Sequence, residues 1–348
     1  MRLNKCIAIM IALTVFLMSG CKNVNKNGDE YNGKINEETR DVFAMDTYMT
    51  LTAYGENAKD AIDEAVDEIH RLDDMFSVGN KDSEVSILNQ NGSEIISEET
   101  EYLFETALQI YKNTEGCFDI TVYPLMVEWG FTNQKYNVPK QDKIDSLLKN
   151  IGTSKIEFDK KEKLISVPDG VEIDFGGIAK GYTSQRIMQI FKKYELVGGV
   201  VSLGGNVQTY GRKPNGEKFR IGVEDPFGNQ DYVGILNVEN KAIITSGGYE
   251  RFFEKDGVKY HHILDPKTGY PAETGLSSVT IVGEDGTMAD GLSTALFVMG
   301  KNDAVDYWKK YAKKESFDMI LVEDNGKITI TEGLEKIFTS ERQIEIVR

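Results

Sequence analysis

A carboxylate and a hydroxyl at helical spacing are the residues of this sequence best suited to hold a metal ion. Asp290 and Thr294 lie in the stretch MADGLSTAL, whose apolar spacing predicts a helix. Residues four apart share one helix face, so both oxygen-bearing side chains would lie one turn from each other. Mg²⁺ prefers such oxygen ligands and keeps positions open for phosphates and water. The alternative is structural: an aspartate in the first turn is favoured by the helix dipole, and Thr294 would then simply pack.

A glycine pair followed by a lysine, in DFGGIAKG at 174–181, could hold an anionic ligand. Gly176 and Gly177 lack a Cβ, so the backbone can approach a ligand or metal closely and a carbonyl could supply a third oxygen. Lys180 offers a mobile positive charge for phosphate oxygens. Asp174 could accept hydrogen bonds from a base or ribose, or anchor the turn. The segment matches neither a P-loop nor a complete dinucleotide fingerprint, and a plain glycine turn with a surface lysine is the alternative.

Two of the three histidines of the chain are neighbours in HHILDPKTGYPA, at 261–272. They stand at the predicted end of a strand, before a turn, where side chains can face a cleft. Successive strand residues point to opposite faces, so only one of His261 and His262 would face inward. A histidine beside a phosphate ester could deprotonate an attacking hydroxyl. The alternative is a core histidine that bonds to the backbone.

The segment EGCFDITVYPLMVEWGF, at 115–131, combines aromatic and apolar residues, with Asp119 embedded among them. A flat aromatic ligand needs apolar walls with a few fixed polar groups, which this segment could provide. Taken one at a time, the same residues also suit a core with a capping aspartate.

The elements that would position these residues mix strands with separate helices. Helical spacing predicts helices over 57–77, 97–116, 182–194, 287–300 and 302–314. Alternation and turn residues predict strands or hairpins over 43–55, 156–167, 197–211 and 317–331. This order favours an α+β fold, with mixed or antiparallel sheets and packed helices, in a single globular unit over 41–348.

Composition narrows the possible ligands. The chain has 348 residues and a formal net charge of −16, which makes nucleic acid an unsuitable partner. A small anionic ligand would need a local cation, a metal ion or oriented backbone N–H groups.

The N-terminus has the pattern of an export signal. Two basic residues precede a short apolar run that ends in SGC, so residues 1–20 are predicted as a signal peptide of the lipoprotein type, with Cys21 lipidated. Residues 21–40 would form a flexible polar tether. An ordinary cleaved signal peptide is the alternative. Cys6 lies in the signal, so Cys117 is left without a cysteine to pair with in the mature chain.

Taken together, eight segments in order along the chain resemble the FAD:protein FMN transferase family of ApbE-like lipoproteins. These segments are MDT, FS…DSEVSILN, CFDITVYPL, DFGGIAKGY, SLGGN, ITSGGYERFF, HHILDPKTGYP and ADGLSTALFVMG. The resemblance covers about 40 to 340. Two departures stand out: Val78-Gly79 replace an aromatic residue that could stack on flavin, and Cys117 stands where a small or apolar residue is more usual.

The resemblance implies an exported or membrane-anchored Mg²⁺ enzyme that cleaves FAD, attaches FMN through a phosphoester bond to a Thr or Ser of a target protein, and releases AMP. It implies a lipid anchor on the outer face of the bacterial cytoplasmic membrane, on the periplasmic side in a Gram-negative cell. Targets would be proteins of membrane or extracellular redox systems. An FAD pyrophosphatase that yields FMN and AMP, or a flavin-binding lipoprotein without activity, would be the alternatives.

The same resemblance implies roles for individual residues. The metal would be held by Asp290, Thr294 and the backbone carbonyl of Gly177, and His262 would be the general base. The residues expected to contact FAD are Met45, Cys117, Phe118, Asp119, Asp174, Lys180 and Ile263.

Overall fold

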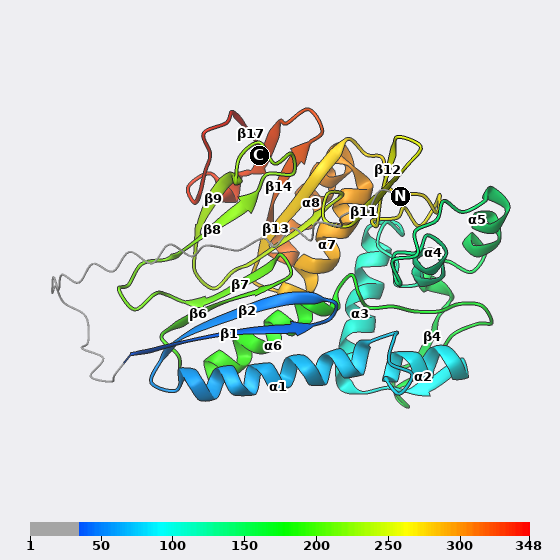
Figure 1. Ribbon diagram of the computed structural model, residues 1–348, viewed down its shortest axis with the longest axis horizontal. Coiled ribbons are helices and arrows are strands. Elements are labelled where there is room, and N and C mark those ends of the chain that lie inside the picture. The colour runs from blue at the N-terminus through cyan, green and yellow to red at the C-terminus, as the bar shows by residue number, and fades with distance from the viewer. Residues whose placement is uncertain (1–34) are drawn as a thin grey trace, which may run out of the picture. The chain divides into compact units, whose positions relative to one another are not determined.

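A nine-stranded sheet organises residues 35–348, the part of the chain that the computed structural model describes (Figure 1). Its neighbouring strands run antiparallel, except for the last pair, which is parallel. In sheet order the strands are β1 (Asn36–Ala44), β2 (Thr47–Gly55), β6 (Gly198–Leu203), β7 (Asn206–Gly211), β10 (Ala242–Gly247), β13 (Leu276–Gly283), β14 (Phe317–Glu323), β15 (Ile328–Thr331) and β17 (Ile344–Val347). The prediction of an α+β fold with mixed and antiparallel sheets is confirmed.

Three small sheets complete the strands. They consist of β3 (Ser93–Ile95), β5 (Leu164–Ser166) and β4 (Glu157–Asp159); of β16 (Phe338–Thr339), β9 (Tyr232–Val238) and β8 (Phe219–Glu224); and of the hairpin β11 (Phe252–Lys255) and β12 (Val258–His261). The helices are α1 (Ala58–Phe76), α2 (Glu84–Asn91), α3 (Glu98–Asn113), α4 (Tyr123–Glu128), α5 (Gln141–Leu148), α6 (Ala179–Lys193), α7 (Gly286–Met299) and α8 (Lys301–Glu315), with short 3₁₀ turns at Thr153–Lys155 and Glu332–Leu334. No helix among residues 35–348 has the length and apolar character that a membrane span requires.

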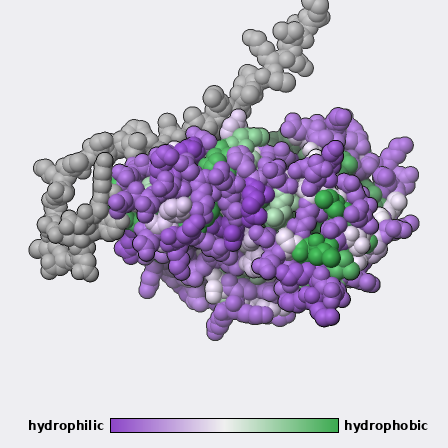
Figure 2. Space-filling model, turned by 90° about the horizontal axis from the view of Figure 1, so that it is seen from below, coloured by the Kyte–Doolittle hydropathy of each residue, from purple (hydrophilic) through white to green (hydrophobic). Residues whose placement is uncertain are grey.

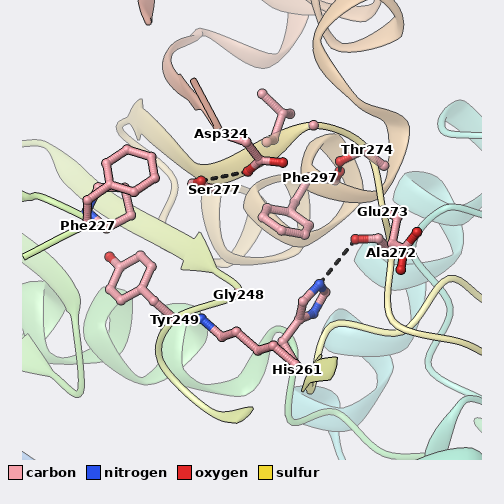
Figure 3. A pocket seen from close by; sticks show the side chains of 14 residues that line it. Phe227, Gly248, Tyr249, His261, Ala272, Glu273, Thr274, Ser277, Phe297 and Asp324 are labelled. Carbon is pink, nitrogen blue, oxygen red and sulfur yellow. Dashed lines mark hydrogen bonds between the residues drawn. The ribbon is translucent and has the colours of Figure 1, made fainter. Parts of the chain in front are cut away.

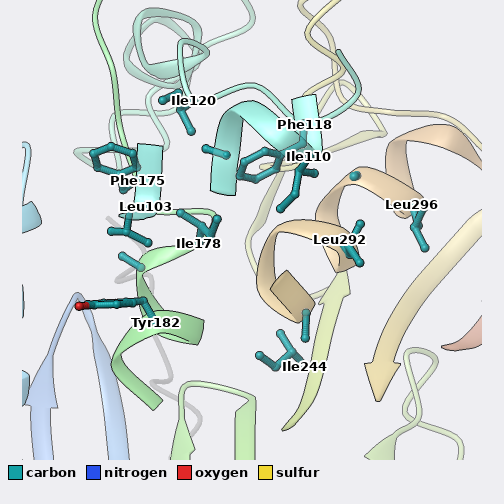
Figure 4. Close-up of a cluster of buried hydrophobic side chains, with 14 of the residues drawn as sticks. Leu103, Ile110, Phe118, Ile120, Phe175, Ile178, Tyr182, Ile244, Leu292 and Leu296 are labelled. Carbon is teal, nitrogen blue, oxygen red and sulfur yellow. The ribbon is translucent and has the colours of Figure 1, made fainter. Parts of the chain in front are cut away.

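The core occupies both faces of the large sheet. On one face, α3, α7 and α8 pack with the 171–182 segment against the central strands (Figure 4). On the other face, the small sheet of β8, β9 and β16 covers the same strands. Along β14, for example, Met319 and Leu321 belong to the first cluster and Ile320 and Val322 to the second, as the alternation of strand side chains requires. Hydrophilic residues cover most of the face seen in Figure 2, with small apolar patches between them.

Helices α6 and α7 touch at glycine residues. A Cβ atom on Gly181 would lie 2.2 Å from the carbonyl oxygen of Gly286 and 2.6 Å from the Cβ of Asp290. A Cβ on Gly286 would lie 2.6 Å from the carbonyl oxygen of Gly181. Only residues without a side chain allow the two backbones to approach so closely. This contact brings the predicted glycine-lysine segment next to the predicted metal-binding helix.

Two boundaries differ from the sequence-based expectation. Strand β1 begins at Asn36, so the tether predicted over 21–40 is too long. The first five residues of this edge strand, NEETR, are all polar, as residues of a tether would be. The strand predicted over 43–55 is the end of β1, a two-residue turn and β2. Met45 and Asp46 both adopt positive φ in that turn, at 48° and 57°, and neither is a glycine that would have signalled it. The helices α2, α4 and α5 were not expected.

The α6–α7 contact predicts that Gly181→Ala destabilises the protein by about 1–3 kcal/mol, because the added methyl group must push the two helices apart. Gly79→Ala is the matched control, since a Cβ there meets its nearest atom at 3.6 Å, an ordinary contact distance. Urea unfolding of both variants measures the effect. Equal stability of the two variants would contradict the close contact.

Candidate active site

One hydrogen bond joins the glycine-lysine segment to α7. The backbone N–H of Gly181 donates to Oδ2 of Asp290 at 2.7 Å. In a regular helix this N–H would bond to the carbonyl of Gly177, four residues earlier. Within residues 35–348, no hydrogen bond reaches the Gly177 carbonyl oxygen. The bond to Asp290 therefore fixes the carboxylate and leaves the Gly177 carbonyl available as a ligand.

Asp290 is a buried acid with spare acceptor capacity. Its side chain is 5% exposed, and burial raises the pKa of its carboxyl, an effect that the nearby Lys180 charge and the Gly181 N–H oppose. Its Oδ1 accepts no hydrogen bond of ordinary geometry from the described residues. Asn206 lies near enough to favour the charged form of Asp290, yet its buried Nδ2 makes no hydrogen bond of ordinary geometry. A buried carboxylate with a free oxygen is stabilised by a bound cation.

Thr294 follows Asp290 by one turn of α7, as the spacing predicted. It is half-buried, and its Oγ1 lies 3.1 Å from Oγ of Ser246 at the end of β10. Ser246 in turn lies 2.8 Å from the hydroxyl of Ser293. A carboxylate, hydroxyls and a free carbonyl form a set of hard oxygen donors, which suits Mg²⁺ rather than a metal that prefers sulfur or imidazole.

Two cations lie near His262, and one of them, Lys180, also lies near Asp290. Lys180 stabilises the charged form of Asp290, and both Lys180 and Arg251 lower the pKa of His262. Among residues 35–348, neither cation has a carboxylate oxygen within 4.0 Å. Arg251 is held through a hydrogen bond to the carbonyl of Phe131 at 2.6 Å. Both positive charges are therefore free to meet an anionic ligand.

Glu250 adds a further acid that the sequence analysis missed. The residue is exposed in part, but loss of water around its carboxyl raises the pKa of Glu250 to about 7; Lys180 opposes the shift, and Glu224 and Asp290 add to it. Sequence reasoning also missed Arg251. The signal for both residues was their place shortly after the glycine pair Gly247-Gly248, in SGGYER.

His262 stands at the end of the β11–β12 hairpin as a neutral base. Its backbone N–H and its Nδ1 both bond to the carbonyl of Arg251, at 3.0 and 3.2 Å. A carbonyl can only accept, so the ring carries its proton on Nδ1 and Nε2 is left as the proton acceptor. Burial, with Arg251 and then Lys180, lowers the pKa of His262 to about 3.

His261 faces the other side of the strand, as the alternation of side chains predicted. Its Nε2 lies 3.1 Å from the carbonyl oxygen of Ala272, and its ring packs edge-on against Phe297 (Figure 3). The charge of Lys180 lowers the pKa of His262 and is not among the main influences on the pKa of His261.

The segment expected to contact flavin lies beside the metal-binding candidates. Phe118 is buried, and its ring is the nearest neighbour of a Cβ placed on Gly177, at 3.1 Å. Asp119 has a structural task, because its Oδ1 accepts from both Thr121 and Thr153, at 2.6 and 2.9 Å between side chains. Cys117 is half-buried, with Sγ 3.9 Å from Nζ of Lys267. Of these three, Phe118 is the residue that touches the glycine pair.

The remaining predicted contacts surround the same segment at different distances. Asp174 accepts from the N–H of Gly176 at 2.8 Å, and burial raises its pKa, against the influence of Gly176 and Arg251. The sulfur of Met45 lies 3.8 Å from Oγ1 of Thr183 on α6. Ile263 is buried, and its carbonyl accepts from Ala272. Among residues 35–348, no hydrogen bond joins Met45 or Ile263 to Gly177, Asp290 or Thr294.

Comparison with known proteins gives one consistent result. The sequence pattern of the ApbE family matches residues 45–320. The FAD:protein FMN transferase of Haemophilus influenzae is 30% identical over 355 residues, covering 98% of this chain and all of the relative. The FAD:protein FMN transferase of Treponema pallidum is 28% identical over 320 residues, covering 85% of this chain and 87% of the relative.

Solved structures agree with the sequence relatives. The crystal structure of the ApbE protein of Thermotoga maritima superposes with a TM-score of 0.81 at 35% identity, covering 88% of this chain and 100% of the other. The apo form of the flavinyl transferase ApbE of Pseudomonas stutzeri gives a TM-score of 0.77 at 26% identity, covering 88% of this chain and 98% of the other.

The environment of His262 predicts a ring that stays neutral at acidic pH. With a pKa of about 3 against 6.5 in an exposed histidine, the folded state resists the proton that the unfolded chain binds below pH 6.5. This residue therefore lowers the stability of the fold as the pH falls from about 6.5 towards 3. In ¹⁵N NMR, we expect His262 as the neutral tautomer with hydrogen on Nδ1 at pH 5, with His262→Gln identifying its signals. A titration midpoint near 6.5, or hydrogen on Nε2, would refute the assignment.

Proposed function

The chain belongs to the ApbE family and is an FAD:protein FMN transferase, and we propose that it works with Mg²⁺ and modifies a Thr or Ser hydroxyl. The hydroxyl oxygen forms a bond to the FMN phosphorus, the pyrophosphate bond of FAD breaks, and AMP departs. The observation that carries this proposal is the bond from Gly181 to Asp290, with the free Gly177 carbonyl that it leaves.

Asp290, Thr294 and the Gly177 carbonyl would hold the metal ion. These residues fit the ion because they offer hard oxygens and because Asp290 is a buried acid with a free oxygen. Bound there, Mg²⁺ would neutralise charge on the diphosphate and on the departing phosphate.

Lys180 and Arg251 would bind the phosphate oxygens from the other side. Phosphoryl transfer needs little covalent help from a protein and depends on positioning and on stabilisation of charge. The two side chains carry positive charge in a net acidic chain, and neither forms a close ion pair in residues 35–348. They would thus attract FAD to a surface that otherwise repels it.

His262 would take the proton of the acceptor hydroxyl. Its Nε2 is the free nitrogen, since Nδ1 is bonded to the Arg251 carbonyl. The lowered pKa keeps the ring unprotonated at neutral pH, so the base is ready before the hydroxyl arrives.

The residues that would contact FAD are Met45, Cys117, Phe118, Asp119, Asp174, Lys180 and Ile263. Phe118 supports this assignment best, because its ring contacts Gly177 and so links an aromatic wall to the metal-binding segment. Asp119 would contribute through its backbone, since its carboxylate is engaged within the fold. Val78 stands where an aromatic residue could have stacked on the flavin, and its side chain packs against the core.

We also propose that the protein is exported and anchored by a lipid on Cys21, and that it modifies proteins of membrane or extracellular redox systems. The signal, Cys21 and most of the predicted tether lie outside the described residues 35–348. The support is the pattern of charge, apolar run and cysteine in the sequence. Acyl labelling that disappears in Cys21→Ser would be the test.

Removing the charge of Asp290 should abolish both metal binding and flavin transfer. Asp290→Asn can still accept from Gly181, so it tests the charge rather than the hydrogen bond. We expect the rate of FMN transfer to fall by at least ~10²-fold, together with Mg²⁺ affinity in calorimetry. Asp285→Asn is the matched control, since Asp285 caps the same helix through the N–H of Met288 at 2.9 Å. Full transfer by Asp290→Asn or Asp290→Ala would show that the site is assigned wrongly.

A further inference from the structure

The hairpin that carries His262 leaves one edge of its second strand unpaired. The backbone of His262 bonds to Arg251 on β11, and Val258 faces Lys255 at the closed end of the hairpin. Hydrogen-bonded pairs alternate along antiparallel strands, so the backbone groups of Val258, Tyr260 and His262 point towards β11. The backbone groups of the residues between them, Lys259 and His261, point outward. Within residues 35–348, no hydrogen bond outside the β11–β12 pairing engages the backbone N–H or carbonyl of either residue.

Two adjoining cavities lie along this edge. Their volumes are about 530 and 430 Å³, and both are lined by Lys259, His261 and the Ala272–Thr274 segment. The smaller cavity is lined by Lys259, Tyr260 and His261, three consecutive residues. Successive strand residues point to opposite faces, so a cavity that touches all three lies along the strand edge. The larger cavity continues past Tyr249 and Phe297 to Ser277 (Figure 3).

We propose that the free edge of β12 binds an extended segment of the acceptor protein as an added strand. This inference rests on the proposed function, because that function requires a polypeptide to present a hydroxyl to His262. Main-chain pairing at an exposed edge supplies affinity without demanding one sequence, and side pockets supply selectivity. The cavities provide such pockets, with the partly exposed rings of Phe227, at 38%, and of Phe252, at 41%, near their rim.

The geometry places the end of such a strand at the catalytic histidine. Just beyond His262, the N–H of Ala272 donates to the carbonyl of Ile263 at 3.0 Å, so the chain's own backbone occupies the edge from that point. An added strand would lie about 4.8 Å from β12 and stop next to His262. Directly opposed residues share a face with their Cβ atoms about 5 Å apart. A Ser or Thr opposite His262 would therefore point to the same side as its imidazole.

Charge is consistent with a polypeptide occupant rather than a second nucleotide. The shared lining contains one lysine and one acid, Lys259 and Glu273, with no surplus of positive charge. The ammonium group of Lys259 lies 3.9 Å from the ring centre of Phe252, which holds it along the hairpin. The edge thus offers mixed polar and aromatic contacts beside unpaired backbone groups.

A proline on the free edge tests the proposal. Lys259→Pro removes an outward N–H and leaves the bonds between β11 and β12 intact, since proline is tolerated on edge strands. Glu254→Pro is the matched control, because Glu254 is the cross-strand partner of Lys259 and points outward from the opposite edge. Lys259→Ala separates the loss of the side chain from the loss of the N–H.

The acceptor is first identified by mass spectrometry, as the membrane protein that gains the mass of FMN with the wild-type enzyme, FAD and Mg²⁺. We expect Lys259→Pro to raise the KM for this acceptor at least ~10-fold. Its affinity for FAD, and any release of AMP by hydrolysis of FAD without an acceptor, should stay unchanged. Glu254→Pro should behave like the wild type, and Lys259→Ala should raise the KM by less than Lys259→Pro does, because it keeps the outward N–H.

Wild-type KM in Lys259→Pro, or an equal rise in Glu254→Pro, would overturn the proposal. So would a wild-type dimer that Lys259→Pro dissociates in sedimentation, since the edge would then pair with a second copy. A loss of FAD affinity confined to Lys259→Pro would assign the cavities to the nucleotide instead. If the wild-type enzyme modifies no protein at all, the proposed function fails, which is a separate result.

Discussion

The hydrogen bond from Gly181 to Asp290 is the interaction on which the site depends. It is possible only because α6 and α7 meet at glycines, where any side chain would separate the helices. The same bond takes from Gly177 the partner that a regular helix would give to its carbonyl. One contact between two helices therefore positions a buried carboxylate and frees a backbone oxygen, and the two groups offer a cation complementary oxygen ligands.

The charges around this bond are arranged for an anionic ligand in an acidic chain. Burial disfavours the ionised form of Asp290, and the positive charge of Lys180 offsets part of this effect. Burial, with the positive charges of Arg251 and Lys180, lowers the pKa of His262 and keeps it neutral. The positive charges that would attract phosphate also repel a proton from the imidazole. The same two cations therefore serve both the binding of an anion and the unprotonated state of the base.

Sequence patterns predicted the local parts of this arrangement, and contacts between distant segments set the rest. The spacing of Asp290 and Thr294 and the opposite faces of His261 and His262 follow from the periods of helix and strand, so they could be anticipated. The partner of Asp290 lies 109 residues away, and no local pattern encodes it. The hydrogen bond of Asp119 to Thr153 could not be anticipated either, because its partner lies 34 residues further along the chain. The turn at Met45 and Asp46 was missed because it contains no glycine.

The central claim is that a divalent cation lies between α7 and the segment before α6. Anomalous diffraction from crystals soaked with Mn²⁺, which takes the same oxygen ligands as Mg²⁺, would test it most directly. The account predicts a peak about 2.0–2.2 Å from both a carboxylate oxygen of Asp290 and the carbonyl oxygen of Gly177. A peak bound elsewhere, with these two oxygens without a metal, would contradict it.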